Sequence, residues 1–260
     1  FIDDGSIDKS LKIIKTLSSK NKKIEYISLS KNFGQQQALF AGICHAKGDF
    51  VITMDADLQH PPNVINKMIE KYEEGFEIVQ TIKTGYENIN IIQKIFKKTY
   101  YFIFNKISNI TLPEHSSDFR LITSNAKNVI SKFNEKQKFM RGIIQFIGFN
   151  YCEIKYDVGK REKGKPVSLL KLFRLGMAGI YSFSNFILML PIYFSILFTF
   201  FNIFYFLLYI NNLNTLFLIF SIFININFIF FGIIGVYLIK ILEQIRDRPD
   251  YIIKEIKQID

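Results

Sequence analysis

Apolar and polar positions follow two alternating periodicities through about the first 82 residues. Ile7, Leu11, Ile14 and Leu17 recur at helical spacing among lysines, which predicts an amphipathic helix. Short apolar runs bounded by polar residues predict strands. The predicted elements are, in order, a helix over 7–17, a strand over 24–29, a helix over 35–46, a strand over 50–54, a helix over 61–74 and a strand over 77–82. This alternation favours an α/β fold with a mainly parallel sheet and helices on both faces.

Residues 91–107 are apolar and aromatic, with lysines as the only charged residues. This pattern predicts an interfacial helix that lies on an anionic membrane surface. A buried core helix whose lysines extend to solvent is an equally good interpretation. A second helix is predicted over about 167–181, leading into the apolar segment that follows.

The 65 residues from 175 to 239 include no Asp, Glu, Lys or Arg. A bilayer span needs roughly 20 residues, so this segment excludes a purely soluble protein. The polar sequence around Asn211 divides it, which predicts two transmembrane helices over 186–210 and 216–239. The predicted organisation is a domain over 1–160, a basic juxtamembrane segment over 161–185, the two spans, and a tail over 240–260. Such an arrangement favours an anchor over a channel or many-span transporter.

The distribution of charge predicts how these spans are oriented. The formal net charge is +10, and seven basic residues against two acidic ones lie between Lys155 and Arg174. Basic residues also follow the second span, whereas the polar sequence between the spans has none, so both ends are predicted to be cytoplasmic. We interpret the basic excess as facing the membrane and not nucleic acid. Two cysteines, Cys44 and Cys152, favour a reducing compartment.

Two acidic clusters follow strand-like sequences. The chain opens on what resembles the end of a strand, which indicates a piece of a longer protein, and Asp3 and Asp4 come next. Asp55 and Asp57 follow the predicted strand over 50–54. Ligands collect beyond the carboxyl ends of parallel strands, so we expect both carboxylate pairs at one edge of the sheet.

Asp55 and Asp57 suit a divalent cation. Mg²⁺ keeps one or two protein carboxylates and fills its shell with phosphate oxygens and water, so two carboxylates one residue apart can share it with a diphosphate. Gln59 adds an oxygen two residues further on. A solvated turn is the alternative interpretation of an isolated Asp-x-Asp sequence.

The other polar motifs also have two interpretations each. Asp3 and Asp4 form either a turn with a helix N-cap or an acceptor for the imide and hydroxyl groups of a nucleoside. Lys31 precedes a predicted helix, where it and free backbone N–H groups can meet a phosphate or a base.

Arg120 and Arg141 suit bidentate phosphate binding and ordinary ion pairs equally well. Asp118 is either a capping residue or a group that orients an acceptor. The histidines have no ligand-like neighbours in the sequence and are interpreted as structural; they are His45, His60 and His115.

Five motifs occur in a recognisable order. They are Asp-Asp-Gly-Ser-x-Asp from Asp3, Lys-Asn-Phe-Gly from Lys31, Asp-Ala-Asp-Leu-Gln-His-Pro-Pro from Asp55, Ser-Asp-Phe-Arg-Leu from Ser117 and Phe-Met-Arg-Gly from Phe139. With the two predicted spans and Arg246-x-Arg248-Pro249 after them, the chain resembles the family-2 glycosyltransferases. Within that family it is similar to the polyprenyl-phosphate glycosyltransferases, relatives of dolichyl-phosphate mannose synthase and bactoprenol glucosyltransferase.

The resemblance implies a GT-A, Rossmann-like catalytic domain, a nucleotide-sugar donor, Mg²⁺ or Mn²⁺ as cofactor, and homo-oligomers as large as tetramers. Carried over motif by motif, the residues on the donor side are Asp3, Asp4, Lys31 and Asp55. Those that hold the metal are Asp55, Asp57 and Gln59.

The acceptor implied by the resemblance is a polyprenyl phosphate. Asp118 matches the aspartate assigned as base or acceptor-positioning group, and it joins Asp57 as a catalytic residue. Arg120 and Arg141 match positions near the acceptor phosphate. Two departures affect this side: Ser124 and Asn125 stand where the family often has a second arginine, and the family's Gly-Glu-Ser-Lys-Tyr-like stretch appears as Gly-Lys-Pro-Val-Ser over 164–168.

The expected reaction is an inverting transfer of a sugar to polyprenyl phosphate at the cytoplasmic face of a membrane. The alternatives are a membrane transferase acting on another lipid or a glycan, and a non-catalytic scaffold with the same fold. A processive polysaccharide synthase is disfavoured, because those enzymes resemble one another in a Gln-x-x-Arg-Trp motif and this chain has no Trp.

Overall fold

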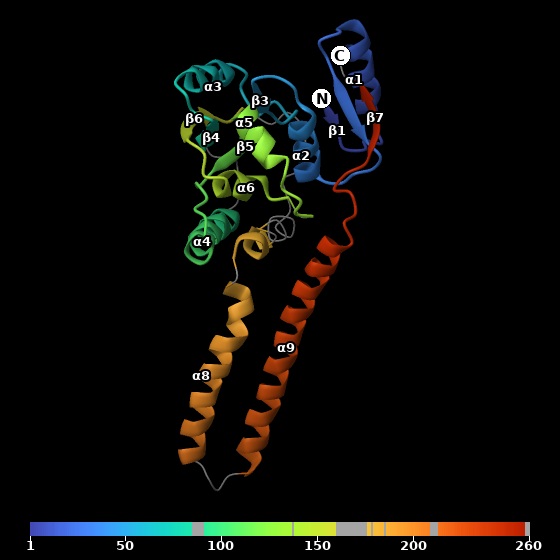
Figure 1. Cartoon of the computed structure of the whole chain (residues 1–260). Helices are drawn as coiled ribbons and strands as arrows, with labels where there is room; N and C mark the ends of the chain where they lie inside the picture. The colour runs from blue at the N-terminus through green and yellow to red at the C-terminus, as the bar shows by residue number, and fades with distance from the viewer. Residues whose placement is uncertain are drawn as a thin grey trace. The chain divides into compact units, whose positions relative to one another are not determined.

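Distant parts of the chain form a three-stranded sheet with the order β1-β2-β7 (Figure 1). In the computed structural model, β1 (Ile2–Asp3) pairs in parallel with β2 (Tyr26–Leu29), and β7 (Ile253–Lys257) pairs antiparallel with β2. The structure describes residues 1–84, 91–136, 138–159, 176–177, 179–184, 186–208 and 213–257. Ile27, Leu29 and Ala41 form the buried cluster beside this sheet.

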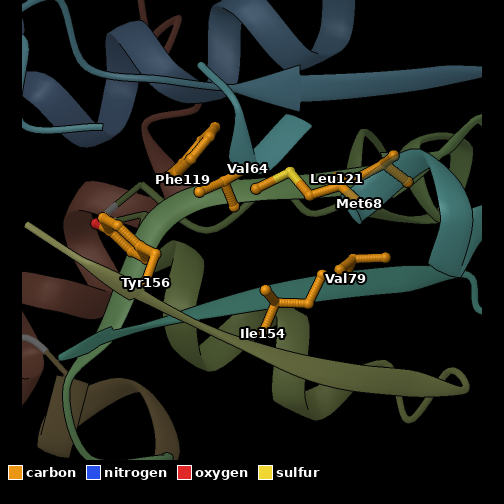
Figure 2. Packing of buried hydrophobic residues seen from close by; sticks show 7 residues of the cluster. All are labelled: Val64, Met68, Val79, Phe119, Leu121, Ile154 and Tyr156. Atoms are coloured by element: carbon orange, nitrogen blue, oxygen red, sulfur yellow. The ribbon is translucent and has the colours of Figure 1, made fainter. Parts of the chain in front are cut away.

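A second sheet has the order β3-β5-β4-β6. Its strands are β3 (Phe50–Thr53), β4 (Ile78–Thr84), β5 (Ser116–Thr123) and β6 (Tyr151–Asp157). Figure 2 shows the core on this sheet, made of Val64, Met68, Val79, Phe119, Leu121, Ile154 and Tyr156. These side chains come from three strands and a helix, so the sheet and its covering helix share one core.

The prediction of a mainly parallel sheet is wrong for the described strands. β1–β2 and β4–β6 are parallel, but β5 runs antiparallel to both β3 and β4, and β7 runs antiparallel to β2. Periodicity shows where a strand forms and not its direction. β5, β6 and β7 were not predicted as strands from the local pattern. The architecture is a mixed α/β fold.

Four helices in the first part of the chain overlap the predicted ranges, although the first begins three residues later than predicted and leaves Ile7 exposed before it. They are α1 (Ser10–Lys20), α2 (Gln35–His45), α3 (Val64–Glu73) and α4 (Ile91–Ile107). Two short helices, α5 (Ser124–Ile130) and α6 (Met140–Phe146), were not predicted. The predicted helix over 167–181 falls largely outside the described residues, as do most of the juxtamembrane segment and the motif over 164–168; the described residues 176–177 and 179–183 are helical.

The helix α4 has one buried and one exposed side. Phe104 is fully buried, whereas Ile95, Phe102 and Ile103 are exposed. The alternative of a fully buried core helix therefore does not hold for this element. An apolar exposed side with lysines is the pattern expected of an interfacial helix.

A separate compact unit, Phe183–Arg248, contains α8 (Phe186–Leu208) and α9 (Leu213–Ile245). Their phenylalanine rings meet at Phe198 and Phe223, with centroids 5.3 Å apart. Among the described residues one helix, Ile222–Ile245, is long and apolar enough to cross a membrane by length and composition. The apolar part of α8, Leu188–Phe201, is shorter. The pair of spans thus stays a prediction. Of the polar sequence over 211–215 that was expected to divide them, residues 211–212 lie outside the described part of the chain, and 213–215 already belong to α9.

Candidate active site

The first and second motifs are held together by Asp4. Its Oδ1 accepts a hydrogen bond from the Phe33 N–H at 2.7 Å, and its Oδ2 accepts one from the Gly34 N–H at 2.9 Å. Gly5 has a φ of +66°, and a Cβ on it would lie 2.3 Å from the carbonyl carbon of Lys31. The loop after β1 can therefore pack this closely against the Lys31 loop only with glycine at that position.

Asp3 and Lys31 differ in their surroundings. Asp3 is 3% exposed, and its carboxylate accepts hydrogen bonds from Ser28 Oγ at 2.9 Å and from the Ser6 N–H at 3.3 Å. Lys31 is exposed, with Nζ 5.2 Å from the centroid of the Phe33 ring. Asp3 thus joins β1 to β2, and Lys31 is accessible to a ligand.

The third motif forms a loop after β3. Asp55 Oδ1 accepts a hydrogen bond from Gln35 Nε2 at 2.9 Å, and Asp57 Oδ1 accepts one from the Gln59 N–H at 3.2 Å. Leu58, between the two aspartates and Gln59, has a positive φ of 62°. The two carboxylates are half-buried, and the helix α2 and the loop's own backbone fix their positions.

The buried His60 contacts the backbone of this loop. It is 1% exposed and stacks on Phe119, with ring centroids 4.9 Å apart and planes 9° apart. Its Nδ1 accepts a hydrogen bond from the Asp55 N–H at 3.0 Å, so Nδ1 is the unprotonated nitrogen. Burial lowers the pKa of His60, which keeps the ring neutral and this acceptor available. The structure agrees with a structural role, and it adds that this role serves the aspartate loop.

Asp118 and Arg120 lie two residues apart on β5, and Arg141 from α6 joins them. Asp118 Oδ1 accepts hydrogen bonds from Arg120 Nη2 at 2.9 Å and from Arg141 Nε at 3.3 Å. Arg120 is 1% exposed, whereas the side chain of Arg141 is 29% exposed. Among the described residues, Arg120 Nε and Nη1 have no hydrogen-bond partner.

The two guanidinium groups stabilise the ionised form of Asp118. Burial alone raises the pKa of Asp118, but the adjacent Arg141 and Arg120 outweigh it and bring that pKa down to about 2. Burial lowers the pKa of Arg120 to about 10, and the Asp118 carboxylate raises the pKa of Arg141. All three groups are therefore charged at neutral pH, and the cluster carries a net positive charge.

The first turn of α2 connects all these parts, a role that was not predicted from the sequence. Gly34 before the helix binds Asp4, Gln35 binds Asp55, and Gln36 Nε2 donates to Asp118 Oδ2 at 3.4 Å. The signal in the sequence is a run of three glutamines at the start of an otherwise apolar helix. The expectation of two carboxylate pairs on one sheet edge is wrong, because β1 and β3 lie in different sheets, yet this turn joins the two pairs.

Comparison with known proteins identifies the family. Residues 1–127 match the Glycosyl transferase family 2 domain. The "Putative glycosyltransferase CsbB" of Bacillus subtilis (strain 168) is 34% identical over 268 residues, which cover 98% of this chain and 80% of that protein. The chain belongs to glycosyltransferase family 2.

Two further relatives in this family have more specific names. The bactoprenol glucosyl transferase of Shigella phage SfV is 32% identical over 269 residues, covering 99% of this chain and 88% of that protein. The SfII prophage-derived bactoprenol glucosyl transferase of Shigella flexneri is 32% identical over 266 residues, covering 98% of this chain and 86% of that protein. The similarity extends through the apolar unit, well beyond the family-2 domain.

The donor atoms around Asp55 in this family-2 glycosyltransferase fit a divalent cation. Carboxylate and amide oxygens are the ligands that Mg²⁺ and Mn²⁺ prefer, and Asp55, Asp57 and Gln59 supply them from one loop. No three His, Cys, Asp or Glu side chains converge in the part of the chain that the structure describes. A cation shared with a diphosphate requires only one or two protein carboxylates, so this loop is sufficient.

Proposed function

We propose that this family-2 glycosyltransferase moves a sugar from a nucleotide-sugar donor to a polyprenyl phosphate at a membrane surface. One observation carries the proposal. Consecutive glutamines of α2 contact Asp55 of the aspartate loop and Asp118 of the arginine cluster. We interpret the aspartate loop as the diphosphate site and the arginine cluster as the acceptor-phosphate site. One helical turn contacts both, which suits a transfer between two phosphate-bearing substrates.

The donor is proposed to bind between the first three motifs of a GT-A catalytic domain. Asp4 and Lys31 face the nucleoside side, and Asp3 supports them from the sheet. Asp55, Asp57 and Gln59 would hold Mg²⁺ or Mn²⁺. When bound, such a cation neutralises negative charge on a departing nucleoside diphosphate.

The acceptor phosphate is proposed to bind at Arg141, which is partly exposed. The buried Arg120 adds positive charge to the same cluster. A phosphate oxygen forms the bond to the anomeric carbon, and the nucleoside diphosphate leaves with the electron pair of the broken C–O bond, which inverts the configuration. A phosphate monoester has a second pKa of about 6, so its oxygen is largely ionised at neutral pH. Asp118 therefore has no proton to remove, and we assign it the orientation of Arg141.

A polyprenyl chain stays in the bilayer, so the reaction must take place at the headgroup level. We propose that α8 and α9 form a two-span anchor with both ends in the cytoplasm, and that the catalytic domain faces the cytoplasm at the inner membrane. The exposed apolar residues of α4 would enter the interface, where each lysine near an anionic surface contributes roughly 1 kcal/mol. The helical apolar stretch Ile222–Ile245 and the exposed Phe102 support this arrangement.

Product analysis tests the proposal. Washed membranes containing the full chain are incubated with a panel of nucleotide sugars, polyprenyl phosphate and Mg²⁺ or Mn²⁺, and the lipid product is weighed by mass spectrometry. We expect one sugar added per polyprenyl phosphate. Asp57→Ala should lower turnover by roughly 100-fold or more while leaving membrane insertion intact. Product on another lipid or on a glycan would reject the proposed acceptor. No donor consumption at all would reject the assignment as an enzyme.

A further inference from the structure

The segment that follows the apolar helix α9 belongs to the catalytic unit. Pro249–Asp260 groups with Phe1–Ser182 and not with the helices that precede it. The Ile252 carbonyl accepts a hydrogen bond from the Ser30 N–H at 2.8 Å, and β7 then pairs with β2. The chain therefore returns from α9 directly into the sheet beside the donor motifs.

Asp250, the first acidic residue of this returning segment, pairs with a buried lysine. Its Oδ2 lies 3.0 Å from Lys138 Nζ, and the Lys138 side chain is 0% exposed. The same ammonium lies 4.0 Å from the centroid of the Phe40 ring and donates to the Phe133 carbonyl. Asp250 Oδ1 also lies 3.9 Å from Lys136 Nζ. A buried charge without a counter-ion is costly, so losing the Asp250 carboxylate should destabilise this position of Lys138.

Lys138 lies just before the helix that carries Arg141. Gln37 Nε2 donates to the Lys136 carbonyl at 2.8 Å, and the Met140 N–H donates to Gln36 Oε1 at 3.1 Å. Gln36 also binds Asp118, the partner of Arg141. A continuous set of contacts thus leads from the tail to the arginine cluster.

Resting on the proposed function, we propose that Asp250 is a positioning residue for the phosphate acceptor. By neutralising Lys138 it fixes the backbone from which Arg141 reaches Asp118. The segment leaving α9 thereby sets the affinity of the site for the lipid phosphate, and the donor side is not affected.

The tail has attachments other than Asp250. Glu255 on β7 binds both Lys15 and Tyr26, and the β2–β7 ladder adds backbone hydrogen bonds. Removing the charge of Asp250 should therefore leave the tail paired with the sheet and change the loop at Lys138. Glu255 provides a matched control, because it is a carboxylate on the same tail with its contacts away from that loop.

The test compares Asp250→Asn with Glu255→Gln in the full chain reconstituted in lipid. For Asp250→Asn we expect the KM for polyprenyl phosphate to rise roughly fivefold or more, with the donor KM within about twofold of the parent value. Glu255→Gln should change neither KM. An unchanged acceptor KM in Asp250→Asn, or the same change in both variants, would overturn the proposal.

Two further measurements keep the test decisive. If Asp250→Asn does not accumulate, the double variant Lys138→Met with Asp250→Asn removes the buried Lys138 ammonium together with its counter-ion. This variant should show the same raised acceptor KM, and a parent-like value would overturn the proposal. Hydrogen exchange of the 138–146 backbone should be faster in Asp250→Asn and not in Glu255→Gln. If the parent makes no lipid product, the proposed function fails, and unchanged exchange separately rejects the positioning role.

Discussion

Gln35 donates its side-chain amide to Asp55 Oδ1 over 2.9 Å, from the first turn of α2. Gln36, the next residue, binds Asp118 instead. Successive residues of an α-helix project about 100° apart, so two neighbours on one turn can reach groups on different sides of the site. The first turn of α2 therefore contacts the aspartate loop through Gln35 and the arginine cluster through Gln36.

This arrangement predicts different kinetic effects of two adjacent substitutions. Gln35→Met should raise the concentration of Mg²⁺ or Mn²⁺ needed for half-maximal transfer by about tenfold, because the substitution removes a partner that orients a metal carboxylate. Gln36→Met should instead raise the acceptor KM roughly fivefold. Steady-state titrations of metal and of polyprenyl phosphate distinguish the two. Equal effects of both variants on both titrations would contradict the separate roles.

The Asp118 cluster predicts a loss of stability in acid. The pKa of Asp118 is about 2 in the folded chain, below its ordinary value of 3.8. A lowered pKa stabilises the folded state above the ordinary value, so this contribution, about 2 kcal/mol, is present above about pH 4 and is lost as the pH falls toward 2. Asp118→Asn should remove this pH dependence. It should also destabilise the fold by about 3–5 kcal/mol, since it leaves buried arginine charge unpaired.

Thermal unfolding of the full chain in detergent, between pH 5 and pH 2.5, checks both effects. Asp8→Asn is the control, because Asp8 is an exposed carboxylate that accepts a hydrogen bond from the Ser10 N–H and belongs to a different part of the fold from the cluster. The unfolding temperature of the parent should fall more in acid than that of Asp118→Asn. An equal fall in both proteins would contradict the assignment of this pH dependence to Asp118.

The sequence predicted local elements well. The helix expected over 91–107 is α4 with the same bounds, and the helix expected over 35–46 is α2 to within one residue. Periodicity reports how a segment presents its own apolar residues, and these helices each bury one side. The five motifs likewise marked the residues that the fold gathers into the candidate site.

The strands and residue roles that were not predicted from the sequence depend on contacts between distant residues. β5 is a central strand that carries Ser117, Asp118 and Arg120, all buried. Because these residues are polar, the segment lacks the apolar pattern by which a central strand is predicted. β7 pairs with β2 from the other end of the chain, and no local pattern shows such a partner. The roles of Gln35 and Gln36 were missed for the same reason, because a glutamine's function depends on what lies opposite it.

Gly5 predicts a stability difference between two glycine substitutions. Gly5→Ala combines a φ of +66° with a Cβ 2.3 Å from the Lys31 backbone, whereas Gly75→Ala has a φ of +93° and no atom within 4 Å. Both variants pay for a left-handed backbone, but only the first also forces the Lys31 loop to move. Gly5→Ala should lower the free energy of unfolding by about 1–3 kcal/mol more than Gly75→Ala. If denaturant titrations gave equal losses of unfolding free energy for both variants, the close contact between the Gly5 loop and the Lys31 loop would not contribute to stability.

The exposed side of α4 predicts a contact with lipid that a single tryptophan can report. The chain has no Trp, so Phe102→Trp introduces the only one. Phe102 is 67% exposed on α4, and Phe1, at 58%, is a similarly exposed phenylalanine beside β1. If α4 lies in the interface, lipids brominated near the headgroup should quench Trp at position 102 in proteoliposomes and shift its emission to the blue.

Phe1→Trp in the same proteoliposomes is the matched control and should be quenched mainly by aqueous acrylamide. Replacing Lys98 and Lys106 by Gln in the Phe102→Trp chain should weaken quenching by brominated lipid in anionic vesicles, because each lysine near such a surface contributes roughly 1 kcal/mol. The same pair of substitutions should have little effect in neutral vesicles. Equal quenching of positions 102 and 1 by brominated lipid would mean that α4 packs against protein or water, and the interfacial assignment would then be abandoned.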